Sequence, residues 1–440
     1  MILTRLLSFV ALAASVTLTS AISISSTSSV DLAIDIEGSE FINGVSFQQN
    51  VISTFGDYQY VVFYNTTSLG YGHHYVNVGR RKVTPSVTKW EILTLSDYEQ
   101  TTLDGHNVIS LGISGDGKIH LSFDHHDVPL NYRVSTAAIA KTIPTSWTAS
   151  LFGPVVHSLP GSTGPWTPLT YPRFKTLSGG DMLMEFRIGQ SGSGDSYLHR
   201  YSTATGQWSA VGKYLQGEDN NAYINGVDSV NGRLFVSWVV RETPDPVTNH
   251  DFYFAYSDDN GVSWKNSAGA AVTKPITPST SGIKIYDIPQ NKDLVNQEGQ
   301  FTDSQGRFHA LQRDSTSGVG RYYHFMRTTA GVWTKDPITP SGLSAPPLLG
   351  KRGKIALDAS GKNMVALLPD DLKGQVGIYG STEQGSFKDW ALLTIIPKTA
   401  CEPLFDPVRL QESDTLSVFI RQNGSYPSRK LQVWDFKLKF

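Results

Sequence analysis

The chain has 440 residues, of which 39% are hydrophobic and 17% are charged, with 40 glycines and 22 prolines. This composition is globular and excludes a disordered, collagen-like or coiled-coil chain. The formal net charge of −2 excludes a basic footprint for nucleic acid or an anionic membrane. A length of about 150 residues per domain would suggest three domains, although a closed all-β fold can exceed that length as one unit.

The first 21 residues are predicted to be a secretory signal peptide. Arg5 supplies the positive n-region, residues 6–18 form the apolar run, and Thr19-Ser20-Ala21 ends in small residues. The apolar run is shorter than the ~20 residues that span a bilayer, which disfavours a membrane anchor. We therefore expect a secreted, extracellular protein with one mature domain over residues 22–440.

Cys401 is the only cysteine, so no internal disulfide can form. It is followed by Glu402 and Pro403, and no histidine motif lies nearby, which favours a buried small residue over a catalytic thiol. The stability of the fold must therefore come from a large core rather than from covalent crosslinks.

Two residue types recur with the same period. Seven of the nine tryptophans stand at positions 90, 147, 208, 264, 333, 390 and 434. A second series places a glycine turn before an apolar strand, at positions 117, 180, 232, 306 and 361. Because both markers recur roughly every 60 residues, the sequence indicates an internal repeat.

The segments between the markers have the length and composition of strands. Residues 58–64 and 252–256 are short aromatic and β-branched runs, and no long segment has the helical period. A repeat of about 60 residues with four strands is typical of a propeller blade. We therefore predict an all-β, single-domain, seven-bladed β-propeller. Residues 257–264 match the Asp-box pattern Ser-x-Asp-x-Gly-x-x-Trp, to which we assign a structural role.

One histidine-rich region stands apart from the repeat. His106 precedes an expected strand at 108–113, and His126 follows the next expected strand at 119–123. Antiparallel neighbours would place both imidazoles at one end of the sheet, where they can serve as base and acid near neutral pH. A zinc pair and a structural histidine pair are the alternatives, although no third zinc ligand lies in the segment.

Two arginines end strongly apolar strands. Arg187 follows residues 182–186, and Arg241 follows residues 234–240. A cation in such a place is costly unless it meets an anion, which suggests a bound carboxylate. Pairing with Glu185 or Glu242 is the structural alternative. Tyr171, in Thr170-Tyr171-Pro172-Arg173, is read either as a packing aromatic or as a site residue.

At these residues the chain resembles the secreted BNR-type seven-bladed propellers, which include polysaccharide lyases acting on uronic acids, among them ulvan lyases. The similarity covers nearly the whole mature chain, and its most specific motifs are Gly105-His106-Asn107 and Asp124-His125-His126, with further matches at 46–50, 58–60 and 296–297. Within the family the chain looks most like fungal lyases that cleave the L-rhamnose-α-1,4-D-glucuronate linkage of gum arabic and related arabinogalactan side chains.

The resemblance implies β-elimination, in which a base removes the C5 proton of glucuronate and the C4–O bond to rhamnose breaks. In glucuronate this proton and O4 lie on the same ring face, so base and acid must lie close together. The implied catalytic residues are His106, His126, Tyr171, Arg187 and Arg241. Asn107 and His125 complete the expected substrate-binding set with the two arginines, although His125 should point away from its neighbour His126 in an extended segment.

Two alternatives from other functional classes remain open. A sialidase-like glycoside hydrolase would need an Arg-Ile-Pro motif, and the nearest string is Arg187-Ile188-Gly189 without the proline. A non-catalytic carbohydrate-binding propeller would bind the polysaccharide and release no product. Both alternatives share the predicted fold and differ from the lyase only in the chemistry of the site.

The resemblance also sets the expected cofactors and partners. It implies no cofactor for catalysis and a structural Ca²⁺ in the central channel, whose ligands the sequence does not name. The expected partner is an acidic, glucuronate-containing polysaccharide, with no nucleic acid and no membrane, and the expected protein is a monomer.

Overall fold

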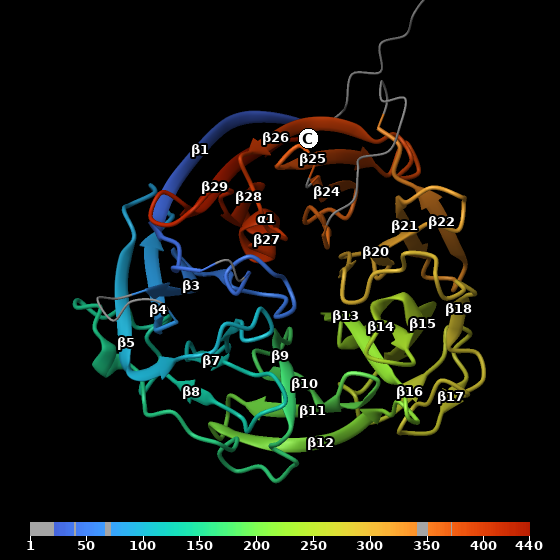
Figure 1. Cartoon of the computed structure of the whole chain (residues 1–440), viewed down its shortest axis with the longest axis horizontal. Helices are drawn as coiled ribbons and strands as arrows, with labels where there is room; N and C mark the ends of the chain where they lie inside the picture. Colours follow the sequence, from blue (N-terminus) through green and yellow to red (C-terminus); the bar gives the residue numbers. More distant parts are fainter. Residues whose placement is uncertain (1–21, 39–40, 67–71, 341–350, 371) are drawn as a thin grey trace, which may run out of the picture.

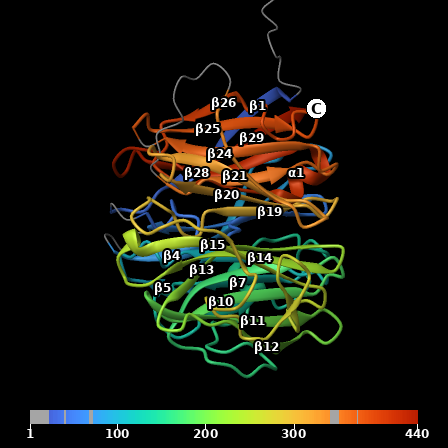
Figure 2. The same ribbon diagram turned by 90° about the vertical axis from the view of Figure 1, so that its right-hand side faces the viewer.

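Seven antiparallel blades follow one another around a central axis (Figure 1). The computed structural model describes residues 22–38, 41–66, 72–340, 351–370 and 372–440. In the side view, the β10–β12 strands lie at one end of the molecule and the β24–β29 strands at the other (Figure 2). The predicted all-β propeller is confirmed, whereas the expected signal peptide lies outside the described residues.

The first four blades are built from residues 52–286. Blade one holds β2 (Ile52–Phe55), β3 (Tyr58–Thr66), β4 (His74–Lys82) and β5 (Glu91–Gln100). Blade two holds β6 (Ile109–Ile113), β7 (Ile119–Phe123) and β8 (Tyr132–Val134), followed by the 3₁₀ turn η1 (Ala149–Leu151). Blade three holds β9 (Leu169–Thr176), β10 (Met182–Gln190), β11 (Ser193–Ser202) and β12 (Gln207–Leu215). Blade four holds β13 (Asn221–Val230), β14 (Arg233–Arg241), η2 (Pro246–Thr248), β15 (Asn249–Ser257), β16 (Trp264–Lys265), β17 (Ala271–Val272) and β18 (Lys284–Tyr286).

The last three blades complete the ring. Blade five holds β19 (Gly299–Thr302), β20 (Phe308–Asp314), β21 (Arg321–Arg327) and β22 (Trp333–Pro337). Blade six holds β23 (Lys354–Leu357), β24 (Asn363–Asp370), β25 (Gln375–Thr382) and β26 (Ala391–Pro397). Blade seven holds β27 (Leu404–Phe405), α1 (Pro407–Ser413), β28 (Thr415–Arg421), β29 (Lys430–Lys439) and β1 (Ser23–Ile34).

The first strand of the described chain closes the ring. β1 pairs antiparallel with β29, from Ser23 opposite Lys439 to Ile34 opposite Lys430 (Figure 1). The last blade therefore takes its outer strand from residues 23–34 and its other three strands from the C-terminal part. This backbone pairing closes the ring without a disulfide, which a single cysteine cannot form. Cys401 itself is buried, and burial raises the pKa of its thiol to about 12.

The two sequence markers fall at fixed places in the blades. The five glycines of the second series each lie in the turn between the first two strands of a blade, with φ between 71° and 88°. A side chain is disfavoured in this left-handed region, so glycine is the natural residue there. Three of the tryptophans stand in the strands β12, β16 and β22, and Trp90 and Trp390 come directly before β5 and β26.

The inner strands are buried on both faces because each blade is packed between its neighbours. All residues of β6, β7 and β28 are buried, whereas the outer strand β5 is mostly exposed. Blades two and three approach so closely that a Cβ on Gly115 would lie 2.4 Å from the Cα of Gly180. The inner strands therefore form a rigid support for the loops that leave them.

The Asp-box residues have the structural role that the motif predicts. Asp259 accepts a hydrogen bond from the backbone N–H of Ser263 at 2.8 Å, and the indole N–H of Trp264 donates to the Gly261 carbonyl at 3.0 Å. The Trp264 ring is buried and stacks on Tyr214 with 5.1 Å between centroids. These contacts fix a turn and a core contact and leave no group for catalysis.

Among the described residues, none of the helices has the length and apolar character needed to cross a membrane.

Candidate functional site

The two predicted histidines meet at one end of blade two. β6 and β7 pair antiparallel with Ile109 opposite Phe123, so the turn before β6 and the turn after β7 lie together. His106 comes from the first turn and His126 from the second, and their rings stack with centroids 4.0 Å apart and planes 23° apart. The predicted juxtaposition is therefore confirmed.

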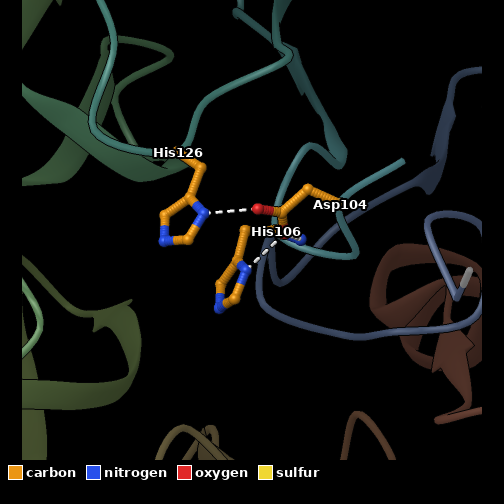
Figure 3. Close-up of side chains that lie close together, drawn as sticks. All are labelled: Asp104, His106 and His126. Carbon is orange, nitrogen blue, oxygen red and sulfur yellow. Dashed lines mark hydrogen bonds and ion pairs between the residues drawn. The ribbon is translucent and has the colours of Figure 1, made fainter. Parts of the chain in front are cut away.

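Asp104 bridges the pair (Figure 3). Its two carboxylate oxygens accept hydrogen bonds from Nδ1 of His106 and Nδ1 of His126, each at 2.5 Å. Both Nε2 atoms consequently point away from the carboxylate, and neither makes a hydrogen bond to the described part of the chain. His126 Nε2 lies 3.9 Å from Asp127 Oδ2, beyond hydrogen-bond distance. Since both side chains are 34% exposed and neither Nε2 is hydrogen-bonded to the described residues, the pair is not a satisfied structural pair.

The bridge changes the acidity of Asp104 and of His126. The hydrogen bond that His126 donates to Asp104, followed by the charges of Asp104 and Asp127, raises the pKa of His126 above its ordinary value. Burial alone would raise the pKa of Asp104, but the hydrogen bonds from both histidines outweigh it and hold that pKa well below its usual range. The geometry therefore favours an ionised carboxylate that accepts one hydrogen bond from each ring.

The same three residues come within metal-ligand reach of one another, so a metal must be considered. Two ligands of one zinc ion, each at about 2.0–2.1 Å in tetrahedral geometry, lie about 3.3 Å apart. The 2.5 Å contacts between Asp104 and the two imidazoles are too short for that arrangement. As placed, the three groups are hydrogen-bonded to one another. Asp104 is nevertheless the third possible ligand that the sequence reasoning did not find in this segment.

An aromatic wall holds the pair in place. The ring of Phe47 lies parallel to His106, 3° off and 5.3 Å away, and Tyr171 lies 5.8 Å from the same imidazole. Tyr171 lies in a β-bulge of β9. Between Thr170 and Arg173, two residues of β9 stand opposite one residue of β10. The φ of Tyr171 is +59°. A bulge of this kind re-aims a side chain, here toward His106, and links Tyr171 to the histidines.

Arg187 also reaches this wall from β10. Its guanidinium carbon lies 4.9 Å from the centroid of Tyr171, and its Nη2 donates to Asp127 at 2.6 Å and to Thr170 at 2.9 Å. Pairing with Glu185, the alternative from the sequence, is wrong because that carboxylate binds Arg173 at 2.8 Å. Arg187 lies in the predicted place, with part of its charge already balanced by Asp127.

Arg241 is held entirely by neutral groups. Its Nε donates to Asn249 Oδ1 at 2.9 Å, its Nη2 donates to Asn296 Oδ1 at 2.8 Å, and Nη1 lies 3.3 Å from the Tyr223 hydroxyl. No carboxylate of the described residues forms an ion pair with it, Glu242 included. A buried cation without an anion is costly, so this arginine is suited to receive a carboxylate from a ligand.

The Tyr171 hydroxyl feels the charges of several arginines, among them Arg352, which follows blade five. Burial and the neighbouring Tyr223 raise the pKa of Tyr171 to about 12, while the charges of Arg187, Arg352 and Arg241 act in the opposite direction. Tyr171 is therefore protonated near neutral pH and can donate a proton or a hydrogen bond.

The two remaining predicted binding residues behave differently. Asn107 lines the cleft beside Asp104 and His126, and its buried Oδ1 has no hydrogen-bond partner among the described residues. His125 points away from the cleft as expected, and its Nε2 accepts from the backbone N–H of Asn131 at 2.8 Å. Burial lowers the pKa of His125 to about 3, so it is a neutral structural residue and its place in the substrate-binding set was wrong.

Sequence reasoning missed three members of the site. Asp104 stands two residues before His106, and that spacing could have identified it as an imidazole partner. Phe47 and Arg352 come from distant blades, and the guanidinium carbon of Arg352 lies 4.6 Å from the Phe47 centroid. Neither residue carries a local signal, because only closure of the ring brings residues 47, 106 and 352 together.

The expected calcium site in the channel does not fit its lining. The axial cavity, about 60 Å³, is lined by Lys175, Lys354 and several amides, with Asp228 as its carboxylate. Both oxygens of Asp228 are already engaged, by Lys175 at 3.4 Å and by Gln300 at 3.0 Å. Calcium needs six to eight oxygen ligands, so these residues do not make a calcium cage and we propose none there.

Comparison with solved structures supports the fold. A polysaccharide lyase crystal structure matches with a TM-score of 0.70 and 16% identity, covering 92% of both chains. An ulvan lyase of family PL25, bound to a GlcA(1-4)Rha unit that carries a sulfate, matches with a TM-score of 0.66 and 14% identity over 92% of this chain and 95% of that one.

Sequence comparison gives relatives and a family. The long-isoform ulvan lyase of Alteromonas sp. (strain LOR) is 27% identical over 224 residues, which cover 42% of this chain and 22% of that protein. The short isoform from the same strain is 25% identical over 228 residues, covering 42% and 43%. This chain thus matches less than half the length of these relatives. The model of the BNR repeat-containing family matches residues 58–341, and the chain belongs to that family.

Proposed function

We propose that the protein is a polysaccharide lyase that cleaves the rhamnosyl-α-1,4-glucuronate linkage of gum arabic and related arabinogalactan side chains by β-elimination. The observation that carries the proposal is the imidazole pair bridged by Asp104. Tyr171 and Tyr223 connect this pair to the uncompensated guanidinium of Arg241. The ulvan lyase relatives support the lyase class. The rhamnosyl linkage rests on the resemblance of the sequence motifs.

In this proposal Arg241 holds the glucuronate carboxylate, with Arg187 close to the same aromatic wall. A guanidinium bound to the carboxylate lowers the free energy of the enolate-like charge that develops there when the C5 proton leaves. The C5–H electron pair then forms the C4–C5 double bond, and the C4–O bond breaks. The departing rhamnose oxygen takes up a proton, leaving free L-rhamnose and an unsaturated uronate.

We assign the base to His106 and the acid to His126. The two roles need one neutral and one protonated imidazole, and the Asp104 bridge supports that state because two charges 4.0 Å apart repel each other. His126 is the better proton carrier, since Asp104 and Asp127 raise its pKa. Tyr171 is the third candidate, a neutral donor beside His106.

Ultraviolet absorbance of the C4–C5 double bond tests the function. Incubation with a rhamnosyl-α-1,4-glucuronate saccharide should raise this absorbance in step with the release of rhamnose. Release of rhamnose without absorbance would indicate a hydrolase, and binding without any product would indicate a carbohydrate-binding propeller. Either result would overturn the proposal.

We also propose that the protein acts outside the cell as a monomer, for which light scattering of the secreted protein is the test.

Replacing Asp104 by asparagine should move the alkaline limb of the pH profile of kcat/KM to lower pH. The carboxylate raises the pKa of His126, so its removal lets this imidazole lose its proton at lower pH, and the acid is lost earlier. Rate measurements from pH 4 to 9 would check this, and an unchanged alkaline limb would show that His126 is not the acid.

A further inference from the structure

A second cleft, of about 330 Å³, adjoins the proposed catalytic site and shares Arg241 with it. We call it the cation cleft. The carboxylates in its lining are Asp293 and Glu402, and its cationic residues are Arg241, Arg313, Lys351 and Arg352. The cations therefore outnumber the carboxylates by two to one.

The two carboxylates do not balance these charges within the cleft. Glu402 is buried and bound to Arg352 at 2.9 Å, and it also accepts from the backbone N–H of Ser46 at 2.9 Å. Asp293 is exposed at the edge, with a φ of +52° in a turn. The interior of the cleft consequently keeps the charges of Arg241 and Arg313.

Arg313 is the residue that the proposed reaction leaves without a role. It lies in β20, and its buried Nε and Nη1 have no hydrogen-bond partner among the described residues. Glu298 lies within electrostatic reach but is fully buried, and burial raises its pKa to about 7 although the Arg313 charge partly offsets this. Unfilled guanidinium donors that line a cleft are the groups that bind carboxylates and sulfates in fork geometry.

The cation cleft is continuous with the aromatic wall beside His106. Arg352 lies over Phe47, whose other neighbour is the His106 ring, and Asn296 accepts hydrogen bonds from both Arg352 and Arg241. A saccharide seated at His106 and Arg241 would therefore place a neighbouring sugar beside Arg313.

We propose that the cation cleft binds a second acidic group of the polymer, a uronate carboxylate or a sulfate ester, on a sugar close to the cleaved glucuronate. This inference rests on the proposed function. The expected consequence is a preference for chains that carry two acidic groups, expressed in KM rather than in kcat, because the contact lies away from the bond that breaks.

Three rhamnosyl-glucuronate oligosaccharides would test the inference: one without a second acid, one with a second glucuronate and one with a sulfate ester. The wild-type protein should favour one or both acidic substrates by about 10- to 100-fold in kcat/KM, the usual range for a charged hydrogen bond. Arg313→Gln should abolish that preference while leaving the singly acidic substrate unchanged. The two acidic substrates show which group the cleft takes.

Arg321→Gln is the matched control, since this half-buried arginine stands on the neighbouring strand β21 and outside the lining of the cleft. Asp293→Asn removes the negative charge at the edge and should strengthen the preference, with little effect on folding because asparagine tolerates positive φ. Product formation without any preference in the wild-type protein would overturn this inference alone. Absence of the unsaturated product from all three substrates would overturn the proposed function.

Discussion

His126→Ala is expected to lower kcat by about 10²–10⁴-fold, and His106→Ala by a similar factor, because each variant removes a positioned proton-transfer group. The loss should appear in kcat more than in KM, since the imidazoles transfer protons in the transition state and contribute little to binding of the substrate. The double variant should be little slower than either single one, because the two rings act as one unit on Asp104.

The absorbance assay under saturating saccharide would measure these losses. His73→Ala is the matched control, since this exposed histidine contacts Glu99 at the surface and lies outside the site. Circular dichroism should show the propeller fold in all four proteins, because the turns of His106 and His126 lie outside the strands. Near-normal rates in both folded single variants would refute the assignment of base and acid.

Arg241→Gln is expected to lower kcat/KM by about 10²–10³-fold, the usual cost of removing one group that stabilises transition-state charge. The physical reason is that Arg241 offers a buried positive charge that no carboxylate of the described residues balances. Arg241→Lys keeps the charge but loses the planar fork, so its activity should fall between those of the wild-type and Gln proteins.

Arg187→Ala should also slow the reaction by at least ~10²-fold.

Arg327→Gln would control for the structural cost of removing a buried guanidinium. Arg327 is buried in β21 and donates to the Ser267 carbonyl at 2.7 Å, in a blade distant from the histidine pair. Its replacement should lower the melting temperature and leave kcat/KM unchanged. If Arg241→Gln lowered stability without lowering kcat/KM, the carboxylate would be held elsewhere.

The repeat was readable from the sequence because blade geometry imposes similar local needs on most blades; blade seven, in which α1 joins β27 to β28, differs. Each hairpin between the first two strands needs a residue with positive φ, and outer strands need a large ring against the next blade. Trp434 and Trp264 depart from this rule because β1 lies outside β29 and β17 lies outside β16, and Trp147 lies in no strand. Pairing between residues 23–34 and 430–439 explains the place of Trp434, and no local pattern reveals such a pairing.

The site was predictable only where it is local. His106 and His126 belong to one hairpin, so strand alternation and antiparallel pairing were sufficient to bring them together. The direction of Tyr171 depends on a bulge that the strand pattern does not reveal. The partner of Arg187 depends on packing between blades two and three, which is why Asp127 rather than Glu185 is found there.

Closure by β1 also has a consequence for how the polypeptide acquires its structure during synthesis. β29 is synthesised long after β1, so β1 must wait unpaired while the blades between them form. Contacts this far apart in the chain form slowly, and unpaired strand edges invite aggregation. A chain truncated before residue 430 would keep two open edges, and we expect it to accumulate as insoluble material rather than as a smaller propeller.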